Sequence, residues 1–248
     1  MSEETQLRER LRLQYLDAMG IPVWKLRSRP ADLPDAPESA ADFERNSPPP
    51  ETMAPAFAAG DDWDSLEAEV SACTLCELHC TRTQTVFGVG NLQATWMVIG
   101  EAPGEQEDLQ GEPFVGRAGQ LLNEMLRAIG LKREEVYIAN ILKCRPPRNR
   151  DPKPEEAAAC ESYLKRQIAL IRPRVILAAG RIAAQNLLKT TEAIGKLRGR
   201  VHEYEGIPLV ITYHPAYLLR APLEKRKAWQ DLLLAVETLN ESPVPPSS

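Results

Sequence analysis

The segment Trp96-Met97-Val98-Ile99-Gly100-Glu101-Ala102-Pro103-Gly104 decides the fold of this chain. Four apolar residues followed at once by a Gly- and Pro-containing turn are typical of a short buried strand that ends in a tight loop. Three further apolar runs follow, over residues 136–139, 175–178 and 209–212. Because these runs are continuous rather than alternating, they indicate strands that are covered on both faces.

Helical stretches separate the four apolar runs. They are predicted at about residues 117–129, 154–170 and 180–189, and a last helix is predicted over about 222–240. Alternating strands and helices predict an α/β fold with three α/β/α layers and a central, mainly parallel sheet of four strands. In such sheets ligands collect beyond the carboxyl ends of the strands, and the unusual residues of this chain follow those ends.

The first 62 residues differ in composition from the rest. Residues 4–19 predict a short amphipathic helix, and residues 30–62 are rich in Pro, Ala and acidic side chains, which predicts a flexible linker. We therefore expect residues 1–62 to be a helix plus linker that is available to an unidentified protein partner. We expect residues 63–242 to form the globular domain and residues 243–248 a disordered tail.

The chain carries no segment that predicts export or membrane insertion. No apolar run approaches the roughly 20 residues that cross a bilayer, and the N-terminus lacks the apolar core of a signal peptide. We expect a monomeric cytoplasmic protein of the bacterial cytosol or nucleoid, with no membrane partner.

The formal net charge of −5 argues against a uniformly basic nucleic-acid binder. The acidic excess falls in residues 1–62, however, and the remainder is neutral overall. Within that remainder, basic residues cluster at 143–150, 196–200 and 220–227. Phosphate binding requires only a local patch, although ordinary solvated surface explains any single cluster equally well.

Four of the five cysteines form two pairs. Cys73 and Cys76 form a C-x-x-C step, and Cys144 and Cys160 follow far downstream. In a reducing compartment such cysteines indicate metal binding or catalysis rather than disulfides. Thiolates select zinc or iron–sulfur centres, and the residues alone leave both open.

Several residues near the strand ends are candidates for a ligand site. The turn at Gly100 offers backbone N–H groups, and Phe114 is placed to stack on a flat ligand. The amide of Asn140 suits the imide edge of a pyrimidine, and His214 can donate to a developing negative charge. Each has a structural alternative: a plain turn, a core aromatic ring, a strand-end turn and a structural histidine. Residues 218–220 suit either a loop that wedges into a duplex or the start of a buried helix.

Together these motifs resemble the family 4 uracil-DNA glycosylases, the iron–sulfur branch of the uracil-DNA glycosylase superfamily. The resemblance covers about residues 68–240. It rests on Cys73-x-x-Cys76, Thr81-Arg82-Thr83-Gln84-Thr85-Val86-Phe87-Gly88, Gly100-Glu101-Ala102-Pro103-Gly104, Pro113-Phe114-Val115-Gly116, Asn140-Ile141-Leu142-Lys143-Cys144-Arg145-Pro146-Pro147, Cys160 and His214-Pro215-Ala216-Tyr217-Leu218-Leu219-Arg220.

The resemblance implies a cofactor and a base pocket. A [4Fe–4S] cluster would be held by Cys73, Cys76, Cys144 and Cys160, with Cys80 as an extra cysteine whose exchange with a ligand stays open. In the pocket, the backbone of Gly100, Glu101 and Ala102 would contact a base carbonyl, Phe114 would stack on uracil, Asn140 would read O4 and N3, and His214 would stabilise charge at O2. Glu101 is the candidate to position the attacking water.

The resemblance further implies a monofunctional DNA glycosylase of base excision repair. Such an enzyme flips uracil out of DNA and hydrolyses its N-glycosidic bond, leaving an abasic site. The basic residues expected to contact DNA are Lys143, Arg145, Arg198 and Arg220. The alternative is a non-catalytic DNA- or polymerase-associated binding module with a cysteine-held metal. Preference among U·G, U·A and single-stranded substrates stays open.

Overall fold

The computed structural model describes Gln14 and residues 62–241. Apart from Gln14 and Asp62, the expected helix and linker of residues 1–62 lie outside the described residues, as does the tail expected at 243–248. The described domain begins with helix α2 (Trp63–Ser71), where the Asp62 side chain accepts a hydrogen bond from the Ser65 backbone N–H. This is an N-cap of the ordinary kind.

A single six-stranded sheet with the order β1-β3-β2-β4-β6-β5 forms the centre of the domain. The four predicted strands are its parallel core: β2 (Trp96–Gly100), β3 (Tyr137–Asn140), β4 (Val175–Ala179) and β6 (Ile207–Thr212). Two antiparallel strands, β1 (Val89–Gly90) and β5 (Val201–Tyr204), close the edges.

The predicted number of four strands is therefore wrong, although the mainly parallel arrangement is confirmed. The physical reason lies in the two edge strands. β1 is only two residues long, and β5 buries only Tyr204. Neither strand forms the continuous apolar run that identifies a strand covered on both faces.

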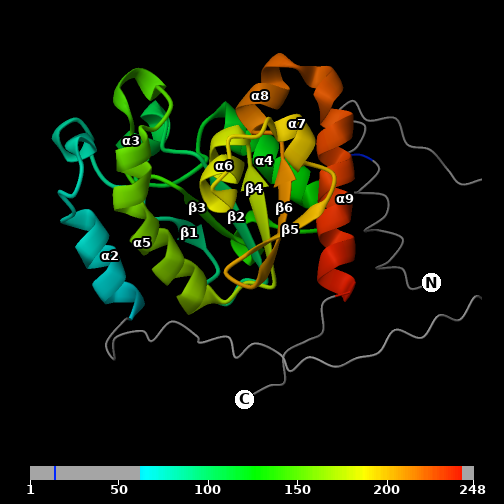
Figure 1. Cartoon of the computed structure of the whole chain (residues 1–248), viewed down its shortest axis with the longest axis horizontal. Coiled ribbons are helices and arrows are strands. Elements are labelled where there is room, and N and C mark those ends of the chain that lie inside the picture. Colours follow the sequence, from blue (N-terminus) through cyan, green and yellow to red (C-terminus); the bar gives the residue numbers. More distant parts are fainter. Residues whose placement is uncertain (1–13, 15–61, 242–248) are drawn as a thin grey trace, which may run out of the picture.

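Helices cover both faces of the sheet, which confirms the three-layer α/β/α arrangement (Figure 1). One core joins the sheet to α2, α5 (Pro154–Ile171), α6 (Arg181–Leu188) and α7 (Ile194–Leu197). The other joins it to α4 (Arg117–Ala128), α8 (Pro215–Arg220) and α9 (Lys225–Glu241). Neighbouring strand residues alternate between the two cores: Met97 and Ile99 face one, Trp96 and Val98 the other.

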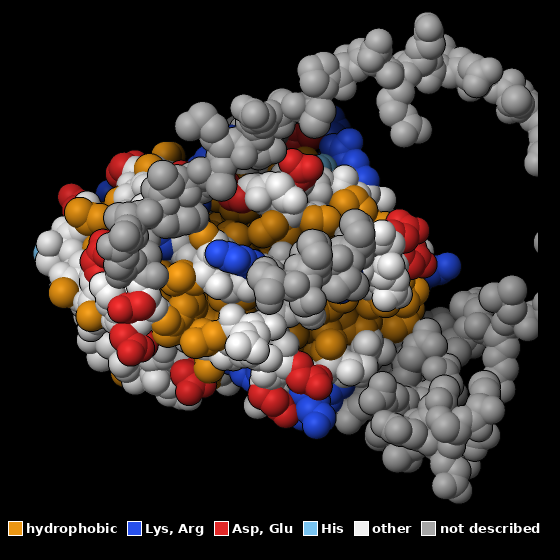
Figure 2. Space-filling model, turned by 90° about the horizontal axis from the view of Figure 1, so that it is seen from below, with side chains coloured by type: hydrophobic (Ala, Val, Ile, Leu, Met, Phe, Trp, Pro, Cys, Tyr) orange, Lys and Arg blue, Asp and Glu red, His pale blue; other side chains and the backbone are white. Residues whose placement is uncertain are grey.

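Short elements complete the chain. Helix α3 (Glu105–Gln110) follows the turn after β2. Four 3-10 helices lie in the connections: η1 (Glu77–Cys80), η2 (Arg133–Glu135), η3 (Pro147–Asn149) and η4 (Pro222–Glu224). No helix in the described part of the chain is long and apolar enough to span a membrane. On the face seen in Figure 2, basic, acidic and apolar side chains are interspersed rather than gathered into one basic surface.

Candidate active site and cysteine pocket

The first cluster of interest lies at the carboxyl ends of the parallel strands, and we call it the rim site: Gly100, Glu101, Phe114, Asn140 and His214. The sheet register pairs Gly100 at the end of β2 with Asn140 at the end of β3. A Cβ at residue 100 would lie 2.7 Å from the Phe114 ring and would also overlap the Asn140 side-chain oxygen. Only glycine lets the two side chains approach this closely.

His214 joins this group from β6. Its ring and that of Phe114 are nearly parallel, with centroids 5.5 Å apart and an interplanar angle of 25°. The structure therefore brings together the aromatic ring, the amide and the imidazole that the sequence analysis singled out. Phe114 comes from the segment between α3 and α4, Asn140 from the last residue of β3, and His214 from the connection between β6 and α8.

Phe114 is held in an unusual backbone conformation. Its φ of 56° lies in the left-handed region, which costs a non-glycine residue about 1–3 kcal/mol and persists only where the surroundings impose it. Glu107 supplies that constraint. One of its carboxylate oxygens accepts hydrogen bonds from the backbone N–H groups of Val115 and Gly116 at 3.0 and 3.2 Å.

The other carboxylate oxygen of Glu107 accepts from the Gly104 N–H at 3.1 Å. Glu107 thus ties the loop that carries Phe114 to the turn after β2. Sequence reasoning missed this residue. The signal that identifies it is local: a Glu three residues after the N-cap position Gly104, as in a capping box.

His214 is a neutral imidazole with a defined tautomer. It is the N-cap of α8, and its Nδ1 accepts a hydrogen bond from the Ala216 N–H at 3.1 Å. The proton of the neutral ring therefore sits on Nε2. Burial, and then the positive charge of Arg220, lower the His214 pKa to about 4. The ring can thus donate one hydrogen bond without carrying a charge.

Asn140 is 2% exposed at the end of β3. Its backbone carbonyl accepts a hydrogen bond from the Lys143 ammonium at 3.1 Å. Its side-chain amide makes no hydrogen bond to any other residue that the structure describes. Since buried amides ordinarily find partners, this amide is available to a ligand at the rim.

Glu101 follows Gly100 and is partly buried. Burial raises its pKa to about 7; the negative charge of Asp151 adds to this effect and the positive charge of Arg181 opposes it. Asp151 and Arg181 form an ion pair of 2.6 Å. A carboxyl group with a pKa near neutrality is suited to exchange protons in catalysis. Ala102, the third residue of the turn, packs against the core that includes α5.

Lys143, one of the four residues expected to contact DNA, is buried, which corrects that expectation, and a second, Arg198, is only partly exposed. Lys143 is 1% exposed and points inward. Arg198 is 12% exposed and is held by the buried carboxylate of Asp231 at 2.8 Å and by the ring of Tyr213. The Lys143 side chain therefore cannot reach a phosphate, whereas the partly exposed guanidinium of Arg198 is engaged by internal contacts.

The other two basic residues remain accessible. Arg220 is exposed at the end of α8. Arg145 is partly exposed and donates to the Asn149 side chain at 2.8 Å. Residues 218–220 are the last residues of α8 rather than a loop or the start of a helix: Leu218 is buried, whereas Leu219 is 38% exposed.

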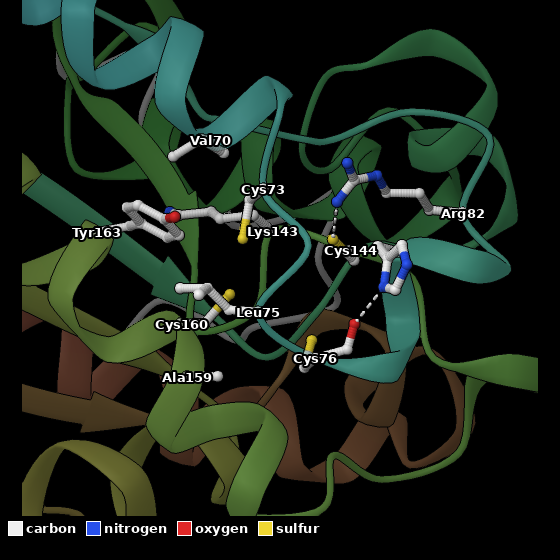
Figure 3. A pocket seen from close by; sticks show the side chains of 11 residues that line it. Val70, Cys73, Leu75, Cys76, Arg82, Lys143, Cys144, Ala159, Cys160 and Tyr163 are labelled. Carbon is white, nitrogen blue, oxygen red and sulfur yellow. Dashed lines mark hydrogen bonds between the residues drawn. The ribbon is translucent and has the colours of Figure 1, made fainter.

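The second cluster is a pocket lined by four cysteines (Figure 3). Cys73 and Cys76 come from the turn after α2, Cys144 from the segment after β3, and Cys160 from α5. Their sulfur atoms surround one space, with about 280 Å³ of empty volume that is partly open to solvent. Cys80 does not line it. Its exposed Sγ lies 3.4 Å from His79 Nε2.

The pocket presents four thiols, a donor set that suits zinc or an iron–sulfur centre. No three His, Cys, Asp or Glu side chains in the described part of the chain lie close enough to hold a single metal ion. Arg82 donates a hydrogen bond to Cys144 Sγ at 3.2 Å, a contact that favours a charged thiolate.

Comparison with known proteins agrees with this geometry. The family model described as the uracil DNA glycosylase superfamily matches residues 87–233. A type-4 uracil-DNA glycosylase of Archaeoglobus fulgidus is 50% identical over 167 residues, which cover 64% of this chain and 84% of that protein. One from Thermotoga maritima is 51% identical over 157 residues, covering 62% and 82%.

A third relative covers more of the chain than these two. The type-4 uracil-DNA glycosylase of Saccharolobus solfataricus is 43% identical over 193 residues, covering 74% of this chain and 89% of that protein. The residues matched by the family model include all four parallel strands and the segments that carry the rim site. This chain belongs to the uracil DNA glycosylase superfamily.

Proposed function

We propose that this protein is a uracil-DNA glycosylase that hydrolyses the N-glycosidic bond of an extruded uracil and leaves an abasic site in DNA. The observation that carries the proposal is the convergence of Phe114, Asn140 and His214 at the carboxyl ends of the parallel strands. An aromatic platform, an amide and a neutral hydrogen-bond donor are the groups that a flipped pyrimidine requires.

Recognition rests on Asn140. Its amide accepts from uracil N3–H and donates to O4, whereas cytosine presents the opposite pattern at these positions. A mismatched base leaves buried polar groups unpaired, and such sites discriminate strongly. Phe114 stacks on the base, and the backbone at Gly100, Glu101 and Ala102 contacts a base carbonyl. Glu107 keeps Phe114 in place before the base arrives.

Cleavage of the bond leaves negative charge on the departing uracil, while the sugar passes through an oxocarbenium-like state, as in glycoside hydrolysis. His214 donates its Nε2 proton in a hydrogen bond to O2, where the charge develops. Since His214 is neutral, it gains this interaction without the cost of keeping a buried cation. Donors of this kind contribute on the order of 10²–10³ in rate.

Water attacks the anomeric carbon, and we assign Glu101 to activate this water. With a pKa of about 7, the carboxylate accepts the proton of the attacking water as the carbon–oxygen bond forms. Burial sets most of that raised pKa; the charge of Asp151 adds to it and the charge of Arg181 opposes it. No lysine is assigned to a covalent step, because the Lys143 ammonium donates to the Asn140 carbonyl and to Gln167 instead.

The four cysteines fit a [4Fe–4S] cluster, which we assign to Cys73, Cys76, Cys144 and Cys160. When bound, the cluster supplies a cross-link between three segments of the chain. The DNA backbone is held by Arg220 and Arg145, which are exposed or partly exposed near the rim. Because such contacts release counterions, uracil release should weaken as the salt concentration rises.

The proposal is tested with a uracil-containing oligonucleotide, with alkali used to cleave at abasic sites. The wild-type protein should produce alkali-labile sites at uracil and not at cytosine. Asn140→Ala should lose at least on the order of 10²-fold in rate, and the matched variant Asn186→Ala on α6 should not. A wild-type protein that binds this DNA without producing abasic sites would overturn the proposal in favour of a binding module.

A further inference from the structure

Lys143 is a buried cation with an unusual set of partners. It is 1% exposed, and its ammonium donates to the Asn140 carbonyl at 3.1 Å and to Gln167 Oε1 at 2.6 Å. Both acceptors are neutral, and no carboxylate of the described residues forms an ion pair with it. A buried charge that lacks a counter-ion costs several kcal/mol, so this arrangement calls for negative charge nearby.

The orientation of Gln167 is fixed by the core, so the contact with Lys143 is not incidental. Gln167 is fully buried on α5, and its Nε2 donates to the Phe87 carbonyl at 3.0 Å and to the Tyr137 hydroxyl at 3.3 Å. These two donations leave Oε1 turned toward Lys143. The surrounding structure is therefore built to hold an ammonium at this point.

The missing negative charge is available in the cysteine pocket. Lys143 lines that pocket together with the four cysteines (Figure 3). Cys160 lines the same pocket, and Cys144 is the next residue in the chain. A [4Fe–4S] cluster with four thiolate ligands carries a net negative charge, and nearby charge and hydrogen bonds set the reduction potential of such a centre.

We propose that Lys143 is a positioning residue that joins the two sites: its ammonium balances the charge of the cysteine-held cluster and fixes the backbone of the base-reading Asn140. The inference rests on the proposed function and on the cluster assignment. It follows that the cluster does more than cross-link three segments. Loss of the cluster leaves Lys143 without its counter-charge and disturbs the residue that reads the base.

The test uses the full chain purified anaerobically with its cluster, and three readouts: reduction potential, iron content and kcat/KM for uracil release. Lys143→Met keeps the length of the side chain but removes its charge. We expect a more negative potential, because an electron is harder to add without the neighbouring cation. We also expect a fall in kcat/KM on the order of 10–100-fold, as for other residues that orient metal ligands.

Two variants separate charge from packing. Lys143→Arg keeps the charge but not the shape, so it should retain the wild-type potential with partly reduced kcat/KM. Lys153→Met removes an exposed lysine that pairs with Glu77 at 3.3 Å. It should change neither the reduction potential nor kcat/KM. If Lys143→Met fails to hold its cluster, Lys143→Arg decides: an iron-loaded protein with the wild-type potential supports the role of charge, and equal loss of iron overturns it.

An unchanged potential and unchanged kcat/KM in iron-loaded Lys143→Met would also overturn the inference. The proposed function fails differently, because then the wild-type protein itself releases no uracil. The potential is measured without substrate, so the contribution of Lys143 to the cluster can be judged whatever the outcome of the glycosylase assay.

Discussion

The rim site and the cysteine pocket are built in different ways. The rim site comes from the sheet: the β2–β3 register places Gly100 beside Asn140, and Glu107 locks the Phe114 loop through three backbone hydrogen bonds. The pocket gathers the turn after α2, the segment after β3 and helix α5. Between α2 and α5 the structure shows an ion pair of Glu69 with Arg166 at 2.5 Å.

This difference indicates where each site obtains its stability. The sheet register and Glu107 position most of the rim residues without a ligand, and Lys143 links only the Asn140 backbone to the pocket. The cysteine pocket brings buried Cys144 and Cys160 together, and burial raises the pKa of both thiols. Thiols in such a place bind metal only after losing protons, so metal binding there is coupled to folding. Changes in the pocket should therefore reach the whole domain, whereas changes at the rim should remain local.

The largest expected effect is that of a cysteine substitution. Cys160→Ser should lose iron and lower the free energy of unfolding by more than about 3 kcal/mol, because structural metal sites contribute about 10–16 kcal/mol of binding free energy to folding. Iron analysis measures the loss of iron, and chemical denaturation measures the free energy of unfolding. A Cys160→Ser protein with full stability would break the comparison, since the pocket would then be as self-supporting as the rim.

The second effect concerns rate alone. His214→Ala should slow uracil release on the order of 10²–10³-fold with unchanged iron content. His202→Ala is the matched control: His202 lies on edge strand β5, where its Nε2 contacts the Leu197 carbonyl at 2.6 Å. It should leave the rate unaltered. Loss of iron in His214→Ala would show that the two sites are not separable in this way.

The third effect is a change in pH dependence. Glu101 is active as the carboxylate, so kcat/KM should rise with pH and level off above its pKa of about 7. Glu101→Gln should be slower, by on the order of 10²–10⁴-fold, and should lack this rise. A profile that stays the same in Glu101→Gln would remove Glu101 from the water-activating role.

Glu101 should also affect the stability of the fold, which should fall with rising pH whereas kcat/KM rises. Its pKa is about 7 in the folded protein and near the ordinary 4.5 when unfolded. Between these values the folded state binds the extra proton, so this group favours folding less as the pH rises. Thermal unfolding across that interval should show a decline that Glu101→Gln abolishes.

The positions of Asn140 and His214 at the rim were predictable from sequence, because each lies at or just after the end of a strand that is recognisable as a continuous apolar run. The edge strands were not, since they bury too little to show that pattern. The burial of Lys143 and the internal ion pair of Arg198 were also not predictable. A basic cluster in the sequence does not reveal which side chains turn inward, and the partner of Arg198 is Asp231, 33 positions away. Glu107 was missed because its function lies in backbone contacts.

The smallest expected effect is that of Cys80→Ser, and it sharpens the definition of the pocket. Cys80 follows Cys76 closely, yet its side chain is exposed and faces His79 rather than the other sulfurs. Its replacement should leave iron content, uracil release and stability unaltered, within about 0.5 kcal/mol for the last. If Cys80→Ser lost iron, Cys80 would be a ligand that moves into the pocket when the cluster binds. If it does not, the direction in which each thiol points, rather than the number of cysteines nearby, determines which four hold the cluster.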